Sequence, residues 1–100
     1  MTPNQNNQLK SAIKPAYIIV AKDGSSKTKF SYYLAESKDI IEAGSFLEFR
    51  GKLLDNKTQA DELNEKPCAT KDAPGISVNR KIPWHNIERL DNITYSKEKV

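Results

Sequence analysis

The chain has 100 residues, of which 29% are charged and 37% are hydrophobic, and its formal net charge is +3. A chain of this length supports a single domain with a thin core, and no stretch reaches the roughly 18 apolar residues that a membrane-spanning helix needs. The single cysteine and the single histidine exclude a disulfide framework and a zinc site of the usual Cys/His type. The sequence pI of about 9.0 suits an anionic partner.

Both ends of the chain are polar. Residues 1–12 show no apolar periodicity, so we expect a disordered arm there, and residues 96–100 are expected to form a charged tail. The domain itself is expected over residues 13–95. The N-terminal arm lacks the apolar segment of a secretory signal, and the lone Cys68 suits a reducing compartment, so we expect a cytoplasmic protein.

The first two predicted elements form a β-hairpin. Tyr17 to Ala21 is a short run dominated by aromatic and β-branched residues, which predicts a strand buried on both faces. The residues from Asp23 to Ser26 favour a turn. From Lys27 to Ala35 apolar and polar side chains alternate, and this period of two predicts a half-buried second strand.

The segment from Glu36 to Gly44 fits two interpretations. In the first, Ser37 caps a short helical turn that ends at Gly44. In the second, residues 39–42 continue as an irregular edge strand. We favour the helical turn.

The segment from Ser45 to Leu54 predicts a third strand, with Gly51 at a bulge or bend of the kind that lets a small barrel close. Residues 55–75 are the least apolar part of the chain, and two prolines interrupt any regular element there. We expect a long loop between the third and fourth strands, with one or two exposed helical turns over residues 59–65.

The C-terminal part closes the predicted fold. Ile76 to Ile82 predicts a fourth strand, Pro83 opens one tight helical turn, and Ile87 to Tyr95 predicts a fifth strand. Proline suits the first helical position because its missing N–H would be unpaired there anyway. The expected fold class is mostly β: a small, strongly bent barrel of five strands, with a short helical turn before the last one.

The motif Ile82-Pro83-x-His85-x-Ile87 carries a family resemblance. It resembles the step in Sm-like domains where the fourth strand ends in an Ile-Pro-like pair, followed by a tight turn and a final strand. It is also similar to a pattern in the C-terminal part of the RNA cyclic-group end-recognition domain. The resemblance covers only this part of the chain. It implies an SH3-like or Sm-like barrel and favours nucleic-acid binding.

Trp84 and His85 lie on the turn that such a barrel presents at its rim. The functional interpretation is a stacking platform, on which an indole or imidazole face takes an unpaired base. The structural interpretation is that Trp84 plugs the barrel end and His85 caps a backbone group. The sequence alone leaves both open.

Basic side chains flank the predicted strands. If the strands are neighbours, these side chains and an interleaved tyrosine form one face that suits a single-stranded nucleic acid. Otherwise the lysines serve to protect strand edges from pairing. Together with Trp84 and His85, the candidate nucleic-acid-binding residues are Lys22, Lys27, Lys29, Tyr33, Arg50, Lys52, Arg80 and Lys81.

We expect a non-enzymatic protein without a cofactor or metal, because the chain offers no phosphate-binding glycine loop and no nucleophile beside a base. The leading hypothesis is binding of RNA or single-stranded nucleic acid. The alternative is a protein–protein interaction module, either an SH3-like adaptor or a small inhibitor. A third hypothesis is a homo-oligomer joined edge to edge, and the oligomeric state is left open.

Overall fold

The computed structural model describes residues 13–22 and 29–96. The predicted turn from Asp23 to Ser26, the arm at residues 1–12 and residues 97–100 of the tail lie outside the described residues. The strands in chain order are β1 (Ile13–Lys22), β2 (Phe30–Glu36), β3 (Ile40–Glu42), β4 (Phe46–Leu53), β5 (Ile76–Pro83) and β6 (Ile87–Ser96). The helix is α2 (Lys57–Glu65), and three single-turn 3-10 helices are η1 (Ser37–Asp39), η2 (Thr70–Asp72) and η3 (Trp84–Asn86). None of these described helices has the length and apolar character that crossing a membrane requires.

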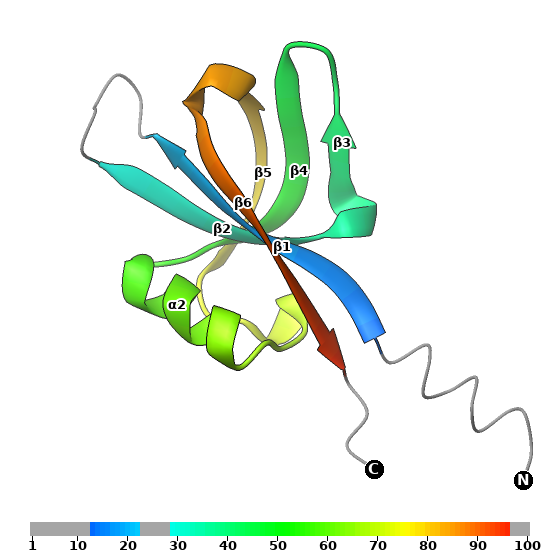
Figure 1. Cartoon of the computed structure of the whole chain (residues 1–100), viewed down its shortest axis with the longest axis vertical. Helices are drawn as coiled ribbons and strands as arrows, with labels where there is room; N and C mark the ends of the chain where they lie inside the picture. Colours follow the sequence, from blue (N-terminus) through cyan, green and yellow to red (C-terminus); the bar gives the residue numbers. More distant parts are fainter. Residues whose placement is uncertain (1–12, 23–28, 97–100) are drawn as a thin grey trace, which may run out of the picture.

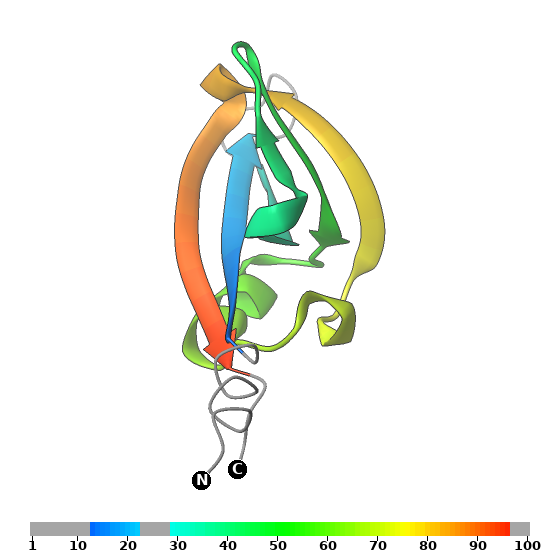
Figure 2. The same ribbon diagram turned by 90° about the vertical axis from the view of Figure 1, so that its right-hand side faces the viewer.

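The six strands form one antiparallel sheet in the order β3-β4-β2-β1-β6, with β5 paired to β4. β1 lies between β2 and β6 and pairs with both, while β4 pairs with β5 along its whole length. The sheet curls strongly, and in Figure 2 β5 and β6 curve away from each other on either side of η3, which joins them. The mostly β, strongly bent small barrel is therefore confirmed, as a half-barrel of six strands rather than five.

Two layers of core lie on opposite faces of the β1–β2 hairpin, because side chains alternate along each strand. The core beneath α2 contains Ile18, Val20, Leu34, Ala60 and Leu63. The core inside the half-barrel contains Ile19, Ala21, Tyr33, Leu47 and Phe49. β1 is thus buried on both faces, as predicted. β2 alternates as expected but is not half-buried, since residues 33–35 are covered on both faces.

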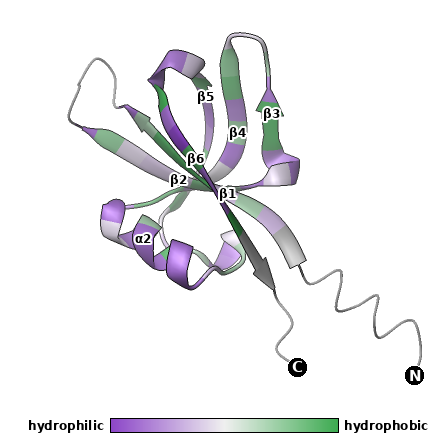
Figure 3. Cartoon of the chain, viewed as in Figure 1, coloured by the Kyte–Doolittle hydropathy of each residue, from purple (hydrophilic) through white to green (hydrophobic). Residues whose placement is uncertain are grey.

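Residues 55–75, expected as a long loop, contain α2 and η2 and cover one end of the half-barrel (Figure 1). α2 begins where the Oδ1 atom of Asn56 accepts a hydrogen bond from the backbone N–H of Gln59 at 3.0 Å, an N-cap contact. Ala60 and Leu63 lie three residues apart on one helix face and are buried against the sheet. The opposite face is mainly hydrophilic (Figure 3). The helix therefore belongs to the core, whereas the sequence predicted exposed turns.

The helical turn expected with Ser37 as its cap is only three residues long, and Ser37 is its first residue, since Glu36 occupies the N-cap position without a side-chain cap. Beyond this turn the second interpretation holds. Residues 40–42 form β3, an edge strand in which Ile40 lies opposite Phe49 of β4. The strand is preferred because Ile40 packs against the half-barrel core, and the ladder with β4 supplies partners for the backbone. Gly44 stops no helix, since it lies in the loop between β3 and β4 without a positive φ.

Gly51 lies in a regular ladder opposite Val78, so of the two features predicted there, a bulge or a bend, the bulge is absent. The structure gives glycine a different role, because a Cβ atom at this position would lie 2.2 Å from the backbone oxygen of Leu34 in β2. Only a residue without a side chain lets β2 and β4 approach this closely. Pro83 also differs from expectation: it ends β5 and precedes η3 instead of opening the helical turn as its first residue.

Candidate nucleic-acid interface

The outer face of the β4–β5 ladder gathers polar and basic side chains. The odd-numbered residues of β4 pack in the half-barrel core, so the alternation of the strand turns its even-numbered residues outward. Residues opposite each other in an antiparallel ladder project from the same face. The outward pairs are Glu48 with Lys81, Arg50 with Asn79, and Lys52 with Ser77. Three of the cations expected from the sequence therefore share one face.

Two adjacent hollows lie on this face. One, of about 430 Å³, extends from η1 across β4 to η2, and the other, of about 620 Å³, lies between η1 and β5. Both are lined by Lys38, Asp39 and Arg50, and the first also by Lys71. Sequence reasoning missed Lys38 and Lys71, because both come from segments outside the predicted strands. We define the basic face as the five side chains Lys38, Arg50, Lys52, Lys71 and Lys81.

Hydrogen bonds hold the two central side chains of the basic face in place. Arg50 Nε donates to Asn79 Oδ1 at 3.2 Å, and Lys52 Nζ donates to the backbone oxygen of Ala73 at 2.9 Å. A guanidinium carries five N–H donors and an ammonium three. Both side chains are therefore oriented by one hydrogen bond and keep further donors for an anion.

Three carboxylates also line the hollows. Glu36 lies 3.8 Å from Lys38 Nζ, whereas Asp39 and Glu48 have no cation within 4.0 Å in the described part of the chain. The first hollow is lined by four cations of the basic face and two carboxylates. The second is lined by three cations of the basic face, together with Arg80, and by two carboxylates. Both hollows therefore carry a surplus of positive charge, which concentrates anions from solution.

Arg80 and Tyr33 do not join the basic face. Arg80 lies opposite Phe49, so its side chain leaves β5 on the other face from Lys81. There its Nε donates to the hydroxyl of Tyr33 at 3.4 Å, with the guanidinium carbon 5.8 Å from the ring centroid. Tyr33 is only 5% exposed and packs edge-on against Phe49. Its ring is not available to stack on a base, and this corrects the role expected for Tyr33.

The lysines of the first hairpin lie elsewhere. Lys22 is the last residue of β1, opposite Phe30, and Lys29 is exposed immediately before β2. Neither lines the two hollows of the basic face. Lys27 lies outside the described residues. The structure thus brings Arg50, Lys52 and Lys81 together and does not bring the hairpin lysines to them.

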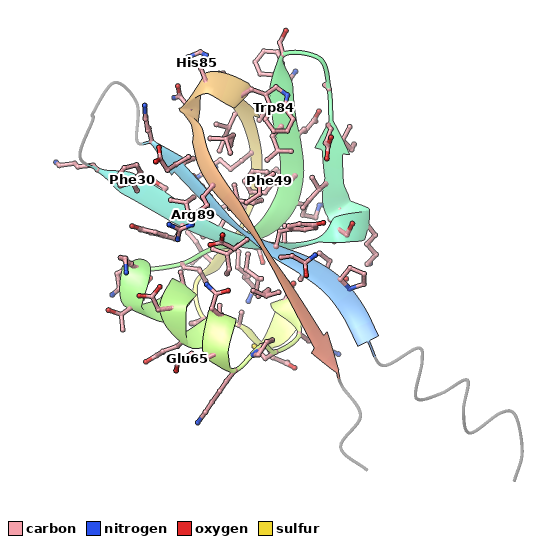
Figure 4. All side chains as sticks on the ribbon, in the orientation of Figure 1. Phe30, Phe49, Glu65, Trp84, His85 and Arg89 are labelled. Atoms are coloured by element: carbon pink, nitrogen blue, oxygen red, sulfur yellow. The ribbon has the colours of Figure 1, made fainter. Side chains whose placement is uncertain are left out.

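Trp84 and His85 lie on η3 at the rim of the half-barrel, Trp84 toward β4 and His85 pointing away (Figure 4). Trp84 Nε1 donates a hydrogen bond to the backbone oxygen of Ala43 at 3.0 Å. The backbone N–H of Trp84 donates a second one to the backbone oxygen of Ser45 at 3.3 Å. Its half-buried ring packs against the core, so Trp84 seals the rim, as the structural interpretation expects. His85 is exposed and its side chain makes no hydrogen bond with the described residues, so it caps no backbone group there.

Phe46 is an aromatic residue of the outer face that sequence reasoning did not select. It lies opposite Pro83, next to η3, and Lys81 Nζ lies 5.0 Å from the centroid of its ring. The ring is half-buried. The alternation of β4 already placed Phe46 on the side of Glu48 and Arg50, and this was the signal that could have identified it.

Cys68 offers little nucleophilic chemistry. Burial, and next the negative charge of Asp72, raise the pKa of its thiol, while Lys52 acts in the opposite direction. A raised pKa lowers the fraction of reactive thiolate at neutral pH. No group of three or more His, Cys, Asp and Glu side chains in the described ranges is arranged to hold a metal ion.

Comparison of the chain with protein-family models, with curated proteins and with solved structures gave no match. The resemblance of the Ile82–Ile87 motif to Sm-like and end-recognition domains therefore stays a prediction.

Proposed function

We propose that this protein binds single-stranded nucleic acid, RNA in particular, without catalysing a reaction. The observation that carries the proposal is the gathering of five cations, three on the outer face of β4–β5 and one each on η1 and η2, around two adjacent hollows with surplus positive charge. Proteins that bind single strands combine a positively charged groove, which follows the backbone, with aromatic side chains that stack on bases. The basic face supplies the first part.

The aromatic part of the proposed site lies at the η3 end of the same face. Phe46, beside Lys81, and the exposed His85 offer ring surface there, and the partly exposed indole of Trp84 lies between the core and solvent. A strand would run from this end toward η2, with its phosphates on Lys81, Arg50 and Lys52. Bases contribute affinity only where they reach an aromatic ring, so phosphate contacts should dominate binding.

The first test is the affinity for a labelled random single-stranded RNA at about 50 and about 200 mM salt, measured by anisotropy and by Trp84 fluorescence. With about four phosphates neutralised, the affinity should fall about fifty-fold over this range, because each contact releases counterions. Trp84 fluorescence should change on binding, since Trp84 is the sole tryptophan and borders the proposed stacking end. Absence of binding at the lower salt concentration, with the protein folded, would contradict the proposal.

The alternative function is protein–protein interaction through the edge of β5 that β4 leaves free. In the described part of the chain β5 pairs only with β4, and Ile76 at its start is 64% exposed. An extended peptide can add to such an edge through backbone hydrogen bonds. Binding of this kind should depend weakly on salt, and assembly of copies edge to edge would give a mass that is a multiple of 11.3 kDa.

A further inference from the structure

The hollow at the η2 end of the basic face differs from a simple charged surface. It is bounded by η1, β4, η2 and the start of β5, and the basic face ends at this hollow. Its volume of about 430 Å³ lies within the range of sites that hold small ligands. Its polar lining consists mainly of cations and hydroxyls: Lys38, Arg50, Lys52, Lys71, Thr70 and Ser77.

Thr70 provides a second, independent observation. Its Oγ1 atom is buried and has no hydrogen-bond partner, and it is the one side-chain atom of this kind in the described part of the chain. Buried hydroxyls normally find a partner, so such an atom calls for an explanation. Because Oγ1 is buried, it reaches the hollow that Thr70 lines only after rotation about χ1 to another staggered position. An anion in the hollow would supply the acceptor that the Thr70 hydroxyl lacks.

The charges of the hollow match a dianion. Four cations line it against two carboxylates, and one of these, Glu36, lies 3.8 Å from Lys38 Nζ. A phosphate monoester carries nearly two negative charges at neutral pH, whereas a phosphodiester within a strand carries one. Arg50 and Lys52 line this hollow, and each is held by one hydrogen bond to a residue outside its lining, Asn79 and Ala73 respectively. Their remaining N–H groups are the donors that phosphate oxygens accept best.

We propose that this hollow is a phosphate site that holds the terminal phosphate monoester of a bound strand. The inference rests on the proposed nucleic-acid binding, and it places the end of the strand at η2 and the following nucleotides along β4–β5 toward η3. Lys71 and Thr70 hold only the terminal group, because both line this hollow and not its neighbour. Arg50 and Lys38 line both hollows and contribute to binding of any strand.

The test uses one RNA sequence of about ten nucleotides with an internal fluorophore, prepared with a 5′-phosphate, with a 3′-phosphate, or with neither. One of the two phosphorylated forms should bind at least about tenfold more tightly than the unmodified strand. Lys71→Gln should remove most of this preference and change the affinity for the unmodified strand less than about threefold. Lys57→Gln, on α2 and outside both hollows, should keep the preference.

Thr70→Val is a second variant, and it tests the phosphate site even if Lys71→Gln fails to fold. It replaces an unpartnered buried hydroxyl by a methyl group of similar size, so the fold should keep its stability. It should lower the preference for the phosphorylated strand about threefold.

The outcomes separate the two proposals. Equal affinity for the three strands would overturn the phosphate site and leave nucleic-acid binding standing. Failure to bind any strand would overturn both. Competition by adenosine monophosphate, lost in Lys71→Gln, would support the phosphate site. Binding of adenosine monophosphate in the absence of any strand binding would assign the hollow to a small phosphorylated molecule and overturn the strand end as its ligand.

Discussion

Gly51→Ala is expected to lower the free energy of unfolding by about 3 kcal/mol or more, at the upper end of the range for overpacking. The added Cβ would lie 2.2 Å from the backbone oxygen of Leu34 and 3.0 Å from the Cβ of Ala35. Both neighbours belong to fully buried residues of β2, so the clash can be relieved only by moving strands apart. For a small domain this is a large share of its total stability. Urea unfolding followed by Trp84 fluorescence measures the change.

Gly44→Ala is the matched control for this prediction. A Cβ at Gly44 would have nothing within 4 Å, and its φ is not positive. The same substitution should therefore change stability by less than about 0.5 kcal/mol. Equal stability of the two variants would mean that β2 and β4 do not approach each other at Gly51, and the curvature of the half-barrel would need another cause.

Leu63→Ala is expected to cost about 2–5 kcal/mol of unfolding free energy, the range for removing a buried leucine side chain. Leu63 is 5% exposed and packs with Ala60 into the core shared by α2 and the β1–β2 hairpin. The substitution leaves a cavity between helix and sheet. The measurement is again urea unfolding, with circular dichroism as a second probe of the helix.

Leu90→Ala removes the same atoms from a leucine of β6 that is 37% exposed. It should cost about 1 kcal/mol or less, because water already reaches the side chain. If Leu63→Ala proved as mild as Leu90→Ala, residues 55–75 would be the detached loop that their composition suggests, and α2 would not stabilise the fold.

The strands were predictable where a local pattern was enough. The run at Tyr17–Ala21, the alternation before Ala35 and the two segments around Pro83 all appear as strands, although β1 extends beyond the predicted run. β3 was not the favoured interpretation, because three residues carry little pattern of their own and the strand exists through its ladder with β4. Its stability comes from pairing with β4 across the short connection at residues 43–45, which propensity within three residues does not show.

The docking of α2 and the role of Gly51 depend on tertiary structure in the same way. A helix with two buried side chains, Ala60 and Leu63, has a weak apolar stripe, so its composition resembles that of a loop. Gly51 was recognised as a special position, but the reason, contact with the backbone of Leu34, joins two strands that are separated by η1 and β3.

The candidate site was predictable in part. The period of two along a strand already places Arg80 and Lys81 on opposite faces. In the structure the two side chains do leave β5 on opposite faces. The contributions of Lys38 and Lys71 were not predictable, because η1 and η2 come to the two ends of one hollow only in the folded sheet. The burial of Tyr33 likewise follows from the curl of β4 over β2, which brings Phe49 against its ring.

The proposed function requires that one face of the molecule, and not its net charge, binds the strand. Salt titrations of single-stranded RNA binding by two double variants of equal net charge distinguish these two causes. Arg50→Gln with Lys81→Gln removes two cations of the basic face, and Lys57→Gln with Lys66→Gln removes two from α2 and its C-terminal end, outside both hollows. The first pair should reduce the magnitude of the salt slope by about 1.4, and the second should leave it unchanged. Equal slopes for the two variants would contradict a binding site on the outer face of β4–β5.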